Sequence, residues 1–201
     1  MINRDFFFKQ VRLTLFGGSL SAKQVNGLTG LLDEWEQHHA AHDDRWLAYA
    51  LATAHHETDR PMQPIHEYGT RERFMRLYDI SGVDPKRAKS MGNTKVGDGA
   101  DYCGRGFVQL TWKNNYIRAG NEIGYPELVN NFDDAMKPEY ARPILFQGMI
   151  GGWFTDKKLS DYFNRDKADW VGARRMINGT DKASLIAGYG EAYYAAISYT
   201  T

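Results

Sequence analysis

Cysteine is almost absent from this chain. Cys103 is the one cysteine among 201 residues, which excludes an internal disulfide framework and a zinc ribbon built from several cysteines. The protein therefore does not need an oxidising compartment to fold. The chain also lacks an excess of one charge, because 25 Lys and Arg residues balance 25 Asp and Glu residues. A dedicated nucleic-acid-binding protein normally carries a basic excess or a basic face, so we expect no nucleic-acid partner.

Long hydrophobic runs are missing as well. In the N-terminal segment "MINRDFFFKQVRLTLFGGSLS", charged residues at positions 4, 5, 9 and 12 interrupt every apolar run. A secretory signal peptide would place its positive charge first and an uninterrupted apolar core after it. We therefore expect no signal peptide and no stable membrane insertion. The segment 5–16 instead predicts an amphipathic helix that ends at Gly17 and Gly18.

The overall composition is that of a globular protein, with 42% hydrophobic and 25% charged residues. A chain of this length can form one domain with a substantial core. No internal repeat, low-complexity tract or interdomain linker is visible. We expect residues 1–201 to form a single domain, on which N-terminal helices from 1–44 pack, with no separate binding module.

Helical patterns dominate the first half of the chain. After Ser21, a plausible N-cap, apolar residues recur at helical spacing at Val25, Leu28, Leu31, Leu32 and Trp35. The next apolar segment, 46–54, is apolar nearly all round and predicts a helix buried on most faces. It ends at residues 55–57, just before Pro61.

The second half combines a glycine-rich segment with further helices. Six glycines interrupt residues 82–106, which predicts a long loop that could hold one short hairpin. Helical spacing returns at 138–154 and 184–197. The expected fold is therefore mainly α, with a loop-rich lobe.

The stretch "TAHHETDRPMQPIHEYGT", residues 53–70, concentrates histidines and acids. A zincin would need the spacing H-E-x-x-H, which is absent. His55 and His56 are adjacent and would point about 100° apart on a helix. His66 could converge on them from the loop, but this is a loose arrangement, and we predict no metal site and no cofactor.

A pair of catalytic carboxylates explains this stretch better than a metal site does. Glu57 lies at the end of a buried helix, where desolvation and the helix dipole both penalise the anion, as suits a general acid. Glu67 follows two prolines in a loop that should leave it solvated and ionised. Such contrasting carboxyls are typical of acid and base in glycoside hydrolysis. The alternative is that Glu57 simply pairs with Arg60 or caps a neighbouring backbone.

A second stretch, "GDGADYCGRGFVQLTWKNNY" at 97–116, has the chemistry to bind a sugar. Arg105 stands between two glycines, which allow close approach of a ligand to the backbone. Amide, hydroxyl and aromatic side chains follow, and these suit sugar hydroxyls and C–H faces: Gln109, Thr111, Trp112, Asn114, Asn115 and Tyr116. The lysine and hydroxyl of a phosphate-binding P-loop are missing.

Together, "AHHET" followed by "HE", then "GRGFVQLTWKNNY" and "RRMINGT", resemble glycoside hydrolase family 19, in the compact branch of phage and prophage endolysins. The resemblance runs over residues 46–197. It implies a lysozyme-like, mainly α-helical fold of two lobes with a substrate groove between them. It also implies inverting cleavage of a β-1,4 bond to an N-acetylated sugar.

The resemblance implies a role for each matching residue. Glu57 would be the general acid and Glu67 the general base, with Thr111 helping to hold the attacking water. Arg174 or Arg175 would keep Glu67 ionised. The remaining candidates for substrate binding are Arg105, Gln109, Trp112, Asn115, Tyr116 and Asn178, with His56 and Tyr68 beside the two acids. The two acids are closer in sequence than in plant chitinases, and residues 71–96 do not match closely.

We therefore expect a monomeric, endolysin-type glycoside hydrolase of peptidoglycan, released to the cell wall by a holin-type route or by lysis. The alternative with the same chemistry is a chitinase acting on chitin. Two other classes stay open. One is an inactive glycan-binding homologue, and the other is a wall peptidase that uses a metal or pairs Cys103 with a histidine.

Overall fold

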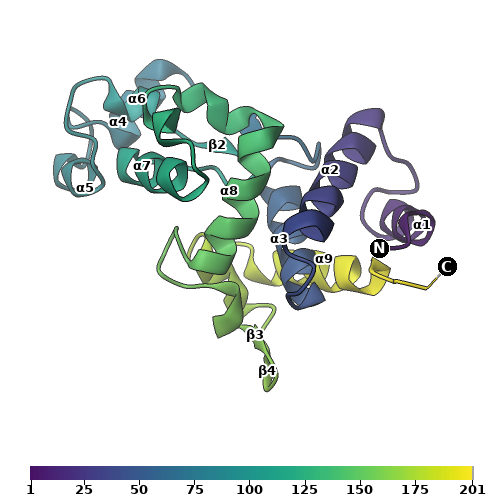
Figure 1. Cartoon of the computed structure of the whole chain (residues 1–201). Coiled ribbons are helices and arrows are strands. Elements are labelled where there is room, and N and C mark those ends of the chain that lie inside the picture. The colour runs from purple at the N-terminus through teal and green to yellow at the C-terminus, as the bar shows by residue number, and fades with distance from the viewer. Residues whose placement is uncertain (201) are drawn as a thin grey trace. The chain divides into compact units, whose positions relative to one another are not determined.

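The computed structural model describes residues 1–200 and is mainly helical, as the sequence predicts (Figure 1). Within these residues there are nine α-helices, four 3₁₀ helices and four strands of two residues each. In chain order they are α1 (Arg4–Thr14), α2 (Ala22–His38), α3 (Asp44–Glu57), β1 (Ile65–His66), α4 (Arg71–Tyr78), α5 (Pro85–Ser90), α6 (Asp98–Asp101), β2 (Arg105–Gly106), α7 (Lys113–Glu122), η1 (Pro126–Val129), η2 (Phe132–Met136), α8 (Pro138–Gly151), η3 (Leu159–Asp161), β3 (Phe163–Asn164), β4 (Lys167–Ala168), η4 (Gly172–Met176) and α9 (Ala183–Ala196). No helix in this described part has the length and apolar character needed to span a bilayer.

The chain forms two compact units. Unit 1 comprises Met1–Gln63 and Leu145–Thr201, and unit 2 comprises Pro64–Ile144. Unit 1 therefore contains α1 to α3 and α9, whereas unit 2 contains β1, α4 to α7 and β2. The division falls within α8, so the chain passes from unit 2 back to unit 1 inside a helix.

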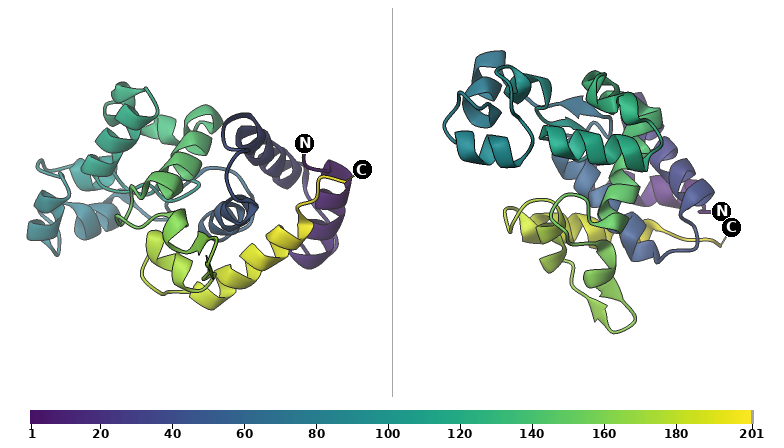
Figure 2. Two further views of the ribbon diagram at one scale, coloured as in Figure 1. Left: turned by 60° about the horizontal axis from the view of Figure 1, so that its bottom comes forward. Right: turned by 60° about the vertical axis from the view of Figure 1, so that its left-hand side comes forward.

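Helices α3 and α9 form the centre of unit 1. Figure 2 shows α9, in yellow, running towards α1, and α9 contacts both α1 and α3. Every residue of α3 from Leu47 to His55 is buried, as expected for a segment that is apolar nearly all round. Aromatic rings join the helices: Tyr193 of α9 stacks on Phe7 of α1 with ring centroids 6.3 Å apart. Burial of such side chains contributes about 1.5–3 kcal/mol each to stability.

The predicted helix ends in unit 1 are confirmed to within a few residues. Ser21 caps α2 by accepting a hydrogen bond from the backbone N–H of Gln24, whose side chain in turn accepts from the N–H of Ser21. This reciprocal arrangement satisfies two donors that a helix start would otherwise leave free. Gly17 and Gly18 follow α1 with left-handed φ of 66° and 94°, which glycine adopts without steric cost.

The sequence predicted a long loop over the glycine-rich segment 82–106. This prediction is wrong, because α5, α6 and β2 lie within the segment. The side chain of Asp84 caps α5, and Pro85 occupies its first turn, a combination that favours a helix start. The short helix α6 depends on tertiary contacts, since the buried Asp79 carboxylate accepts hydrogen bonds from the N–H groups of Gly97 and Gly99.

The strand β2, at the end of segment 82–106, pairs with a strand that lies outside this segment. β2 lies antiparallel to β1, with Ile65 opposite Gly106 and His66 opposite Arg105. The hairpin considered for 82–106 is therefore absent from the described structure of this segment, and a long-range pairing of β1 with β2 takes its place. This pairing brings the residue after β1, Glu67, alongside the glycine before β2, Gly104, with 2.7 Å between the Glu67 nitrogen and the Gly104 oxygen.

Candidate active site

Glu57 is the last residue of α3 and its partner is Arg174. The Arg174 Nη1 atom lies 2.6 Å from Glu57 Oε1, and the arginine side chain is only 2% exposed, against 15% for the glutamate. The 3₁₀ helix η4 positions Arg174, whose Nε donates to the backbone oxygen of Asp181. The Glu57 carboxyl is thus held by a buried cation in unit 1.

This ion pair bears on the choice between Arg174 and Arg175 and on the local alternative, Arg60. Of the two candidate arginines, Arg174 is buried and bonded to a carboxylate, whereas Arg175 is exposed. The carboxylate that Arg174 contacts within unit 1 is that of Glu57, whereas the expectation that this arginine keeps Glu67 ionised stays a prediction. Arg60, the local alternative, is also exposed and forms no ion pair among residues 1–200. With a guanidinium 2.6 Å from its carboxyl, the environment of Glu57 is less purely apolar than the sequence predicted.

The chain just after Glu57 is conformationally unusual. Asp59, Arg60 and Met62 all have left-handed backbones, with φ of 52°, 75° and 55°. Non-glycine residues adopt this region at a cost, and such residues cluster at functional sites. The segment is held against α2, because a Cβ atom on Gly27 would lie 1.7 Å from the Met62 carbonyl oxygen. Glycine at position 27 is therefore required for this close approach.

His55 lies in the core beside the candidate acid. Its Nδ1 atom is 2.9 Å from the Tyr193 hydroxyl, and its ring stacks on Tyr189 with centroids 4.4 Å apart. Burial, followed by the nearby positive charge of Arg60, lowers the pKa of His55 to about 4. His55 is thus a neutral core residue near neutral pH. The next residue, His56, which was predicted to bind substrate, is half-buried.

Glu67 of unit 2 is held by neutral donors. The Tyr78 hydroxyl donates to Glu67 Oε1 at 2.9 Å, and the Gly104 N–H donates to Oε2 at 3.1 Å. A larger residue at position 104 would crowd the site, because a Cβ atom there would lie 2.8 Å from Gln109 Oε1 and 3.1 Å from Glu67 Oε2. Two directed hydrogen bonds therefore fix the orientation of this carboxylate.

Tyr78 was not among the site residues predicted from the sequence. It lies at the C-terminal end of α4, and its ring also packs edge-on against Trp112, with centroids 5.1 Å apart. Burial and then the neighbouring Glu67 charge raise the pKa of Tyr78, which keeps the phenol protonated as a donor. Its position in the sequence carries no motif, so only the fold of unit 2 reveals its contact with Glu67.

The loop that contains Thr111 has a strained backbone. Gln109 and Trp112, on either side of it, have positive φ of 53° and 78°. The Thr111 hydroxyl donates to the Gln109 carbonyl at 2.7 Å, which leaves its oxygen lone pairs available to accept a hydrogen bond. Asn115 donates back to the Thr111 carbonyl at 2.7 Å. The structure thus fixes the Thr111 side chain locally.

Two candidates for substrate binding lie inside unit 2. Arg105 is 3% exposed, and its Nη1 donates to the Tyr116 hydroxyl at 3.1 Å and to the Asp101 carbonyl at 2.8 Å. Tyr116 is completely buried and donates to the Cys103 carbonyl at 2.9 Å. Their observed contacts are internal, which indicates that both residues support the loop rather than meet solvent.

The other candidates differ in accessibility. Tyr68 is 70% exposed, next to Glu67, and Trp112 is 8% exposed. Gln109 is half-buried and donates to the Ile65 carbonyl at 3.3 Å. Asn178 is exposed in unit 1, four residues after Arg174. The exposed ring of Tyr68 is the most open aromatic surface beside a candidate catalytic acid.

Cys103 has the geometry of a thiol–imidazole pair but not the reactivity. Its Sγ atom is 3.3 Å from His66 Nε2, while the thiol is completely buried. Burial raises the pKa of Cys103 to about 11, so the nucleophilic thiolate is scarce at neutral pH. Among residues 1–200, no three His, Cys, Asp or Glu side chains cluster closely enough to hold a metal ion.

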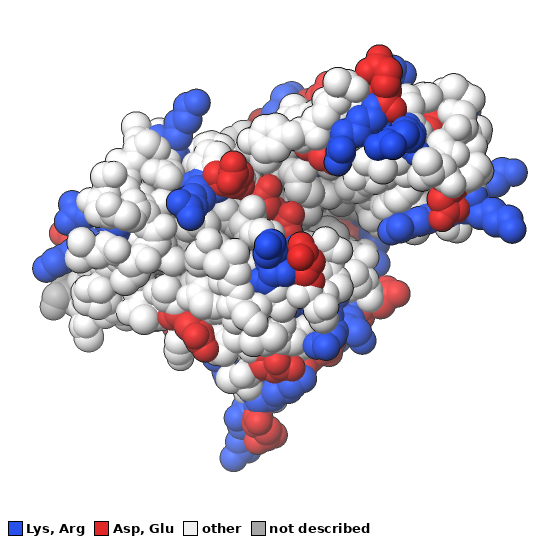
Figure 3. All heavy atoms as spheres, turned by 180° about the vertical axis from the view of Figure 1, so that it is seen from behind, with Lys and Arg blue, Asp and Glu red and all other residues white. Residues whose placement is uncertain are grey.

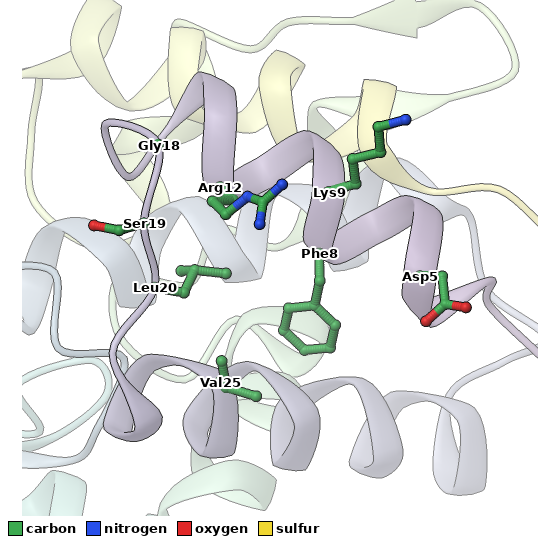
Figure 4. Close-up of a pocket in the computed structure, with 8 residues that line it drawn as sticks. All are labelled: Asp5, Phe8, Lys9, Arg12, Gly18, Ser19, Leu20 and Val25. Carbon is green, nitrogen blue, oxygen red and sulfur yellow. The ribbon is translucent and has the colours of Figure 1, made fainter.

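An open pocket of about 660 Å³ lies elsewhere in unit 1, between α1 and α2. Figure 4 shows Phe8 pointing from α1 towards Val25 of α2, with Leu20 beside them and Lys9 and Arg12 along α1. None of the candidate site residues lines this pocket. The candidate chemistry is therefore not located there.

Comparison with known proteins gives a result for structure and none for sequence. No protein-family model matches the chain, and no curated protein matches it by sequence. A bacterial family 19 chitinase is similar in structure, with a TM-score of 0.54 and 19% identity over 96% of this chain and 93% of the chitinase. The chain has the family 19 chitinase fold. The predicted lysozyme-like, mainly α architecture is thereby confirmed.

A second solved structure supports the same fold. A variant of chitinase C in which one glutamate is replaced by glutamine has a TM-score of 0.52 and 17% identity, and the match covers 95% of this chain and 73% of the chitinase chain. At such low identity, the likeness extends to the fold and not to the chemistry of individual residues. The activity has to be argued from the side chains.

Proposed function

We propose that this protein is an inverting glycoside hydrolase that cleaves β-1,4 bonds in the glycan strands of peptidoglycan. The observation that carries the proposal is that two carboxyl groups, those of Glu57 and Glu67, each have a fixed partner in a protein with a chitinase fold. Glu57 is bound by buried Arg174, and Glu67 is oriented by Tyr78 and the Gly104 N–H. Two carboxyls in distinct environments are what acid and base catalysis of glycoside hydrolysis requires.

Glu57 is the proposed general acid. As the general acid, it has to carry a proton when it meets the glycosidic oxygen. Arg174 then orients the carboxyl and stabilises the carboxylate left after the proton has been transferred.

Glu67 is the proposed general base, and Thr111 helps to place the attacking water. The two hydrogen bonds from Tyr78 and the Gly104 N–H fix the orientation of the Glu67 carboxyl towards the position proposed for the water. The Thr111 hydroxyl can accept a hydrogen bond from the same water, because its own proton is directed to the Gln109 carbonyl. Inversion further requires that both carboxyls act on opposite faces of one sugar.

Chitin is the second candidate substrate, because both similar structures are chitinases. A non-catalytic glycan-binding protein would not need two oriented carboxyls. A cysteine peptidase is disfavoured by the buried, protonated Cys103. In this proposal the protein acts as a monomer on the cell wall, which it reaches by a holin-type release or after lysis.

The direct test measures new reducing sugar ends released from purified sacculi. We expect Glu57→Gln and Glu67→Gln each to lower the rate by roughly 10²–10⁴-fold. The exposed Glu191→Gln should match the wild type, and EDTA should have no effect. Release of peptides without new reducing ends, or full activity of Glu57→Gln, would refute the proposal. Activity on chitin oligomers alone would favour the chitinase.

A second measurement separates the acid from the base. Aryl glycosides of chitin oligomers with a nitrophenolate leaving group need little protonation at the departing oxygen. We expect Glu57→Gln to recover much of its activity on such substrates, whereas Glu67→Gln should stay inactive because its water is not activated. The opposite pattern would exchange the two roles.

A further inference from the structure

Unit 2 carries a basic surface on a chain without net charge. Residues 71–96 contain seven Lys and Arg and three Asp and Glu, a net charge of +4. All seven cations are exposed. We call them the α4–α5 basic surface: Arg71, Arg73, Arg76, Lys86, Arg87, Lys89 and Lys95. At the end of unit 2 that holds α4 and α5, on the right of the reversed view, Lys and Arg side chains gather (Figure 3).

Most of these cations have no acidic partner. Arg71 forms an exposed ion pair with Asp101 at 3.4 Å, and the other six form no ion pair among the described residues 1–200. Among the acids of the segment, Glu72 and Asp84 are exposed but form no ion pair with these cations in the described residues, and the Asp84 carboxylate accepts a hydrogen bond from the Arg87 N–H at the start of α5. The other nearby acids are buried. Asp79 is buried among backbone N–H donors, and Asp98 accepts from two backbone N–H groups and pairs with Lys113 at 3.6 Å. The positive charge of this surface is therefore available to a partner.

The basic surface is connected to the candidate active site inside unit 2. The guanidinium of Arg87 lies 5.5 Å from the centre of the Trp112 ring. Trp112 packs on Tyr78, which donates to Glu67. At its end, α5 is tied to the start of α7 by a hydrogen bond from the Asn114 N–H to the Met91 carbonyl at 3.1 Å. Arg87, which belongs to the basic surface, is thus linked to Glu67 through Trp112 and Tyr78, all within unit 2.

We propose that the α4–α5 basic surface binds the carboxylates of peptide stems on a glycan strand, and so selects peptidoglycan over uncharged chitin. This inference rests on the proposed function. Chitin offers no carboxylates, whereas peptide stems carry them at regular intervals along the glycan. Lys and Arg side chains on a solvated surface attract such groups over about a Debye length, roughly 8–10 Å at moderate salt.

A nucleic acid is the competing anionic partner. The cations are confined to one short segment, and the remaining chain has a net charge of −4, since the whole chain is neutral. A nucleic-acid-binding domain normally extends its basic face over the length of the duplex or strand. The proximity to Trp112 and Glu67 also favours a partner that continues from the sugar-binding residues.

The test measures binding, so that it does not depend on turnover. All proteins carry Glu57→Gln to prevent digestion of the sacculi, and co-sedimentation gives the apparent Kd. One variant adds Arg76→Gln, Lys86→Gln, Lys89→Gln and Lys95→Gln. The matched control replaces four exposed cations of unit 1 that form no ion pair within residues 1–200: Lys9→Gln, Arg12→Gln, Lys23→Gln and Lys157→Gln. The ligands are native sacculi, sacculi whose carboxylates are converted to neutral amides, chitin particles and a double-stranded DNA oligonucleotide.

We expect the unit 2 variant to bind native sacculi about tenfold more weakly, since each exposed ion pair contributes a few tenths of a kcal/mol. On amidated sacculi and chitin it should bind like its parent, and the unit 1 control should bind like the parent throughout. An equal loss on native and amidated sacculi would overturn the inference, as would no loss on native sacculi. Tighter binding to DNA than to native sacculi would replace it with the nucleic-acid partner.

Failure of this inference is distinguishable from failure of the proposed function. If the wild type releases reducing ends from sacculi and Glu57→Gln does not, the proposed function stands whatever the basic surface does. If no sugar ends appear but the unit 2 variant still discriminates native from amidated sacculi, the surface binds peptidoglycan in a protein with another activity.

Discussion

The two units hold their candidate catalytic acids by different means. In unit 1 a buried guanidinium, that of Arg174, contacts Glu57 at 2.6 Å. In unit 2 a phenol and a backbone N–H donate to Glu67 at 2.9 and 3.1 Å. When one partner of a buried ion pair is removed, the other is left as an uncompensated buried charge. Removal of a neutral donor lowers the free energy of unfolding by less. The partner of Glu57 should therefore matter most for stability, and the partner of Glu67 for rate.

The largest effect is expected from Arg174→Met. Removal of the cation leaves the Glu57 carboxylate largely buried without a partner, which should lower the free energy of unfolding by about 3 kcal/mol. Urea denaturation measures this loss. Arg175→Met, at the exposed neighbouring position, should cost less than about 0.5 kcal/mol.

The double variant Arg174→Met/Glu57→Gln sharpens this prediction. If the cost comes from the stranded charge, the second substitution should recover part of the stability, because it removes that charge. Additive losses would show instead that Arg174 stabilises unit 1 through its bond to the Asp181 carbonyl and its packing.

The next largest effect is expected in the pH dependence of the stability of unit 1, through His55. The pKa of His55 is lowered to about 4 by burial, while its unfolded value is about 6.5. Between these values the unfolded chain binds more protons, so stability is complete above about pH 6.5 and is lost as pH falls towards 4. At pH 5 this loss should be about 2 kcal/mol relative to pH 7.5.

The check for His55 is a pair of urea titrations at the two pH values. His55→Gln cannot take up the proton, so its stability should fall by about 2 kcal/mol less than that of the wild type. A wild-type dependence in His55→Gln would mean that other groups control the acid sensitivity of unit 1.

The smallest effect is expected from Tyr78→Phe. Loss of the hydroxyl removes one of the two donors to Glu67 and retains the ring that packs on Trp112. We expect kcat to fall about tenfold, which corresponds to about 1.5 kcal/mol for a hydrogen bond to a charged group, with KM and the unfolding free energy nearly unchanged.

An unchanged kcat in Tyr78→Phe would break the comparison, since Glu67 would then not depend on its neutral donors. A loss confined to stability would make Tyr78 a packing residue. Tyr102→Phe, which removes another largely buried hydroxyl of unit 2, donated to the Val129 carbonyl at 3.1 Å, provides the matched control and should leave kcat unchanged.

Long helices with strong periodic patterns were predictable. The apolar spacing and the Ser21 cap predicted α2, and the continuous apolar segment predicted the buried α3. Both signals are local, so they do not depend on the rest of the fold. The short helix α6 was missed because its four residues are too few for a periodic pattern and depend on Asp79, about twenty residues earlier.

The contacts of the site residues were less predictable than their identities. Glu57 and Glu67 were selected from sequence, but the partner of Glu57 lies 117 residues away and was assigned to the other carboxyl. Arg105 was expected to face a ligand because glycines flank it, whereas its guanidinium packs inside unit 2. Flanking glycines indicate backbone freedom and say nothing about the direction of the side chain between them.

The sequence by itself determined the helical class of the protein, the main helix boundaries and the presence of two acids within ten residues, because periodicity, caps and composition act over short stretches of chain. Only the tertiary structure decided that Arg174 pairs with Glu57, that Tyr78 and Gly104 hold Glu67, and that Arg105 and Tyr116 are buried. These outcomes depend on which distant segments pack together, and an ion pair or hydrogen bond forms only where packing brings its atoms within about 3 Å.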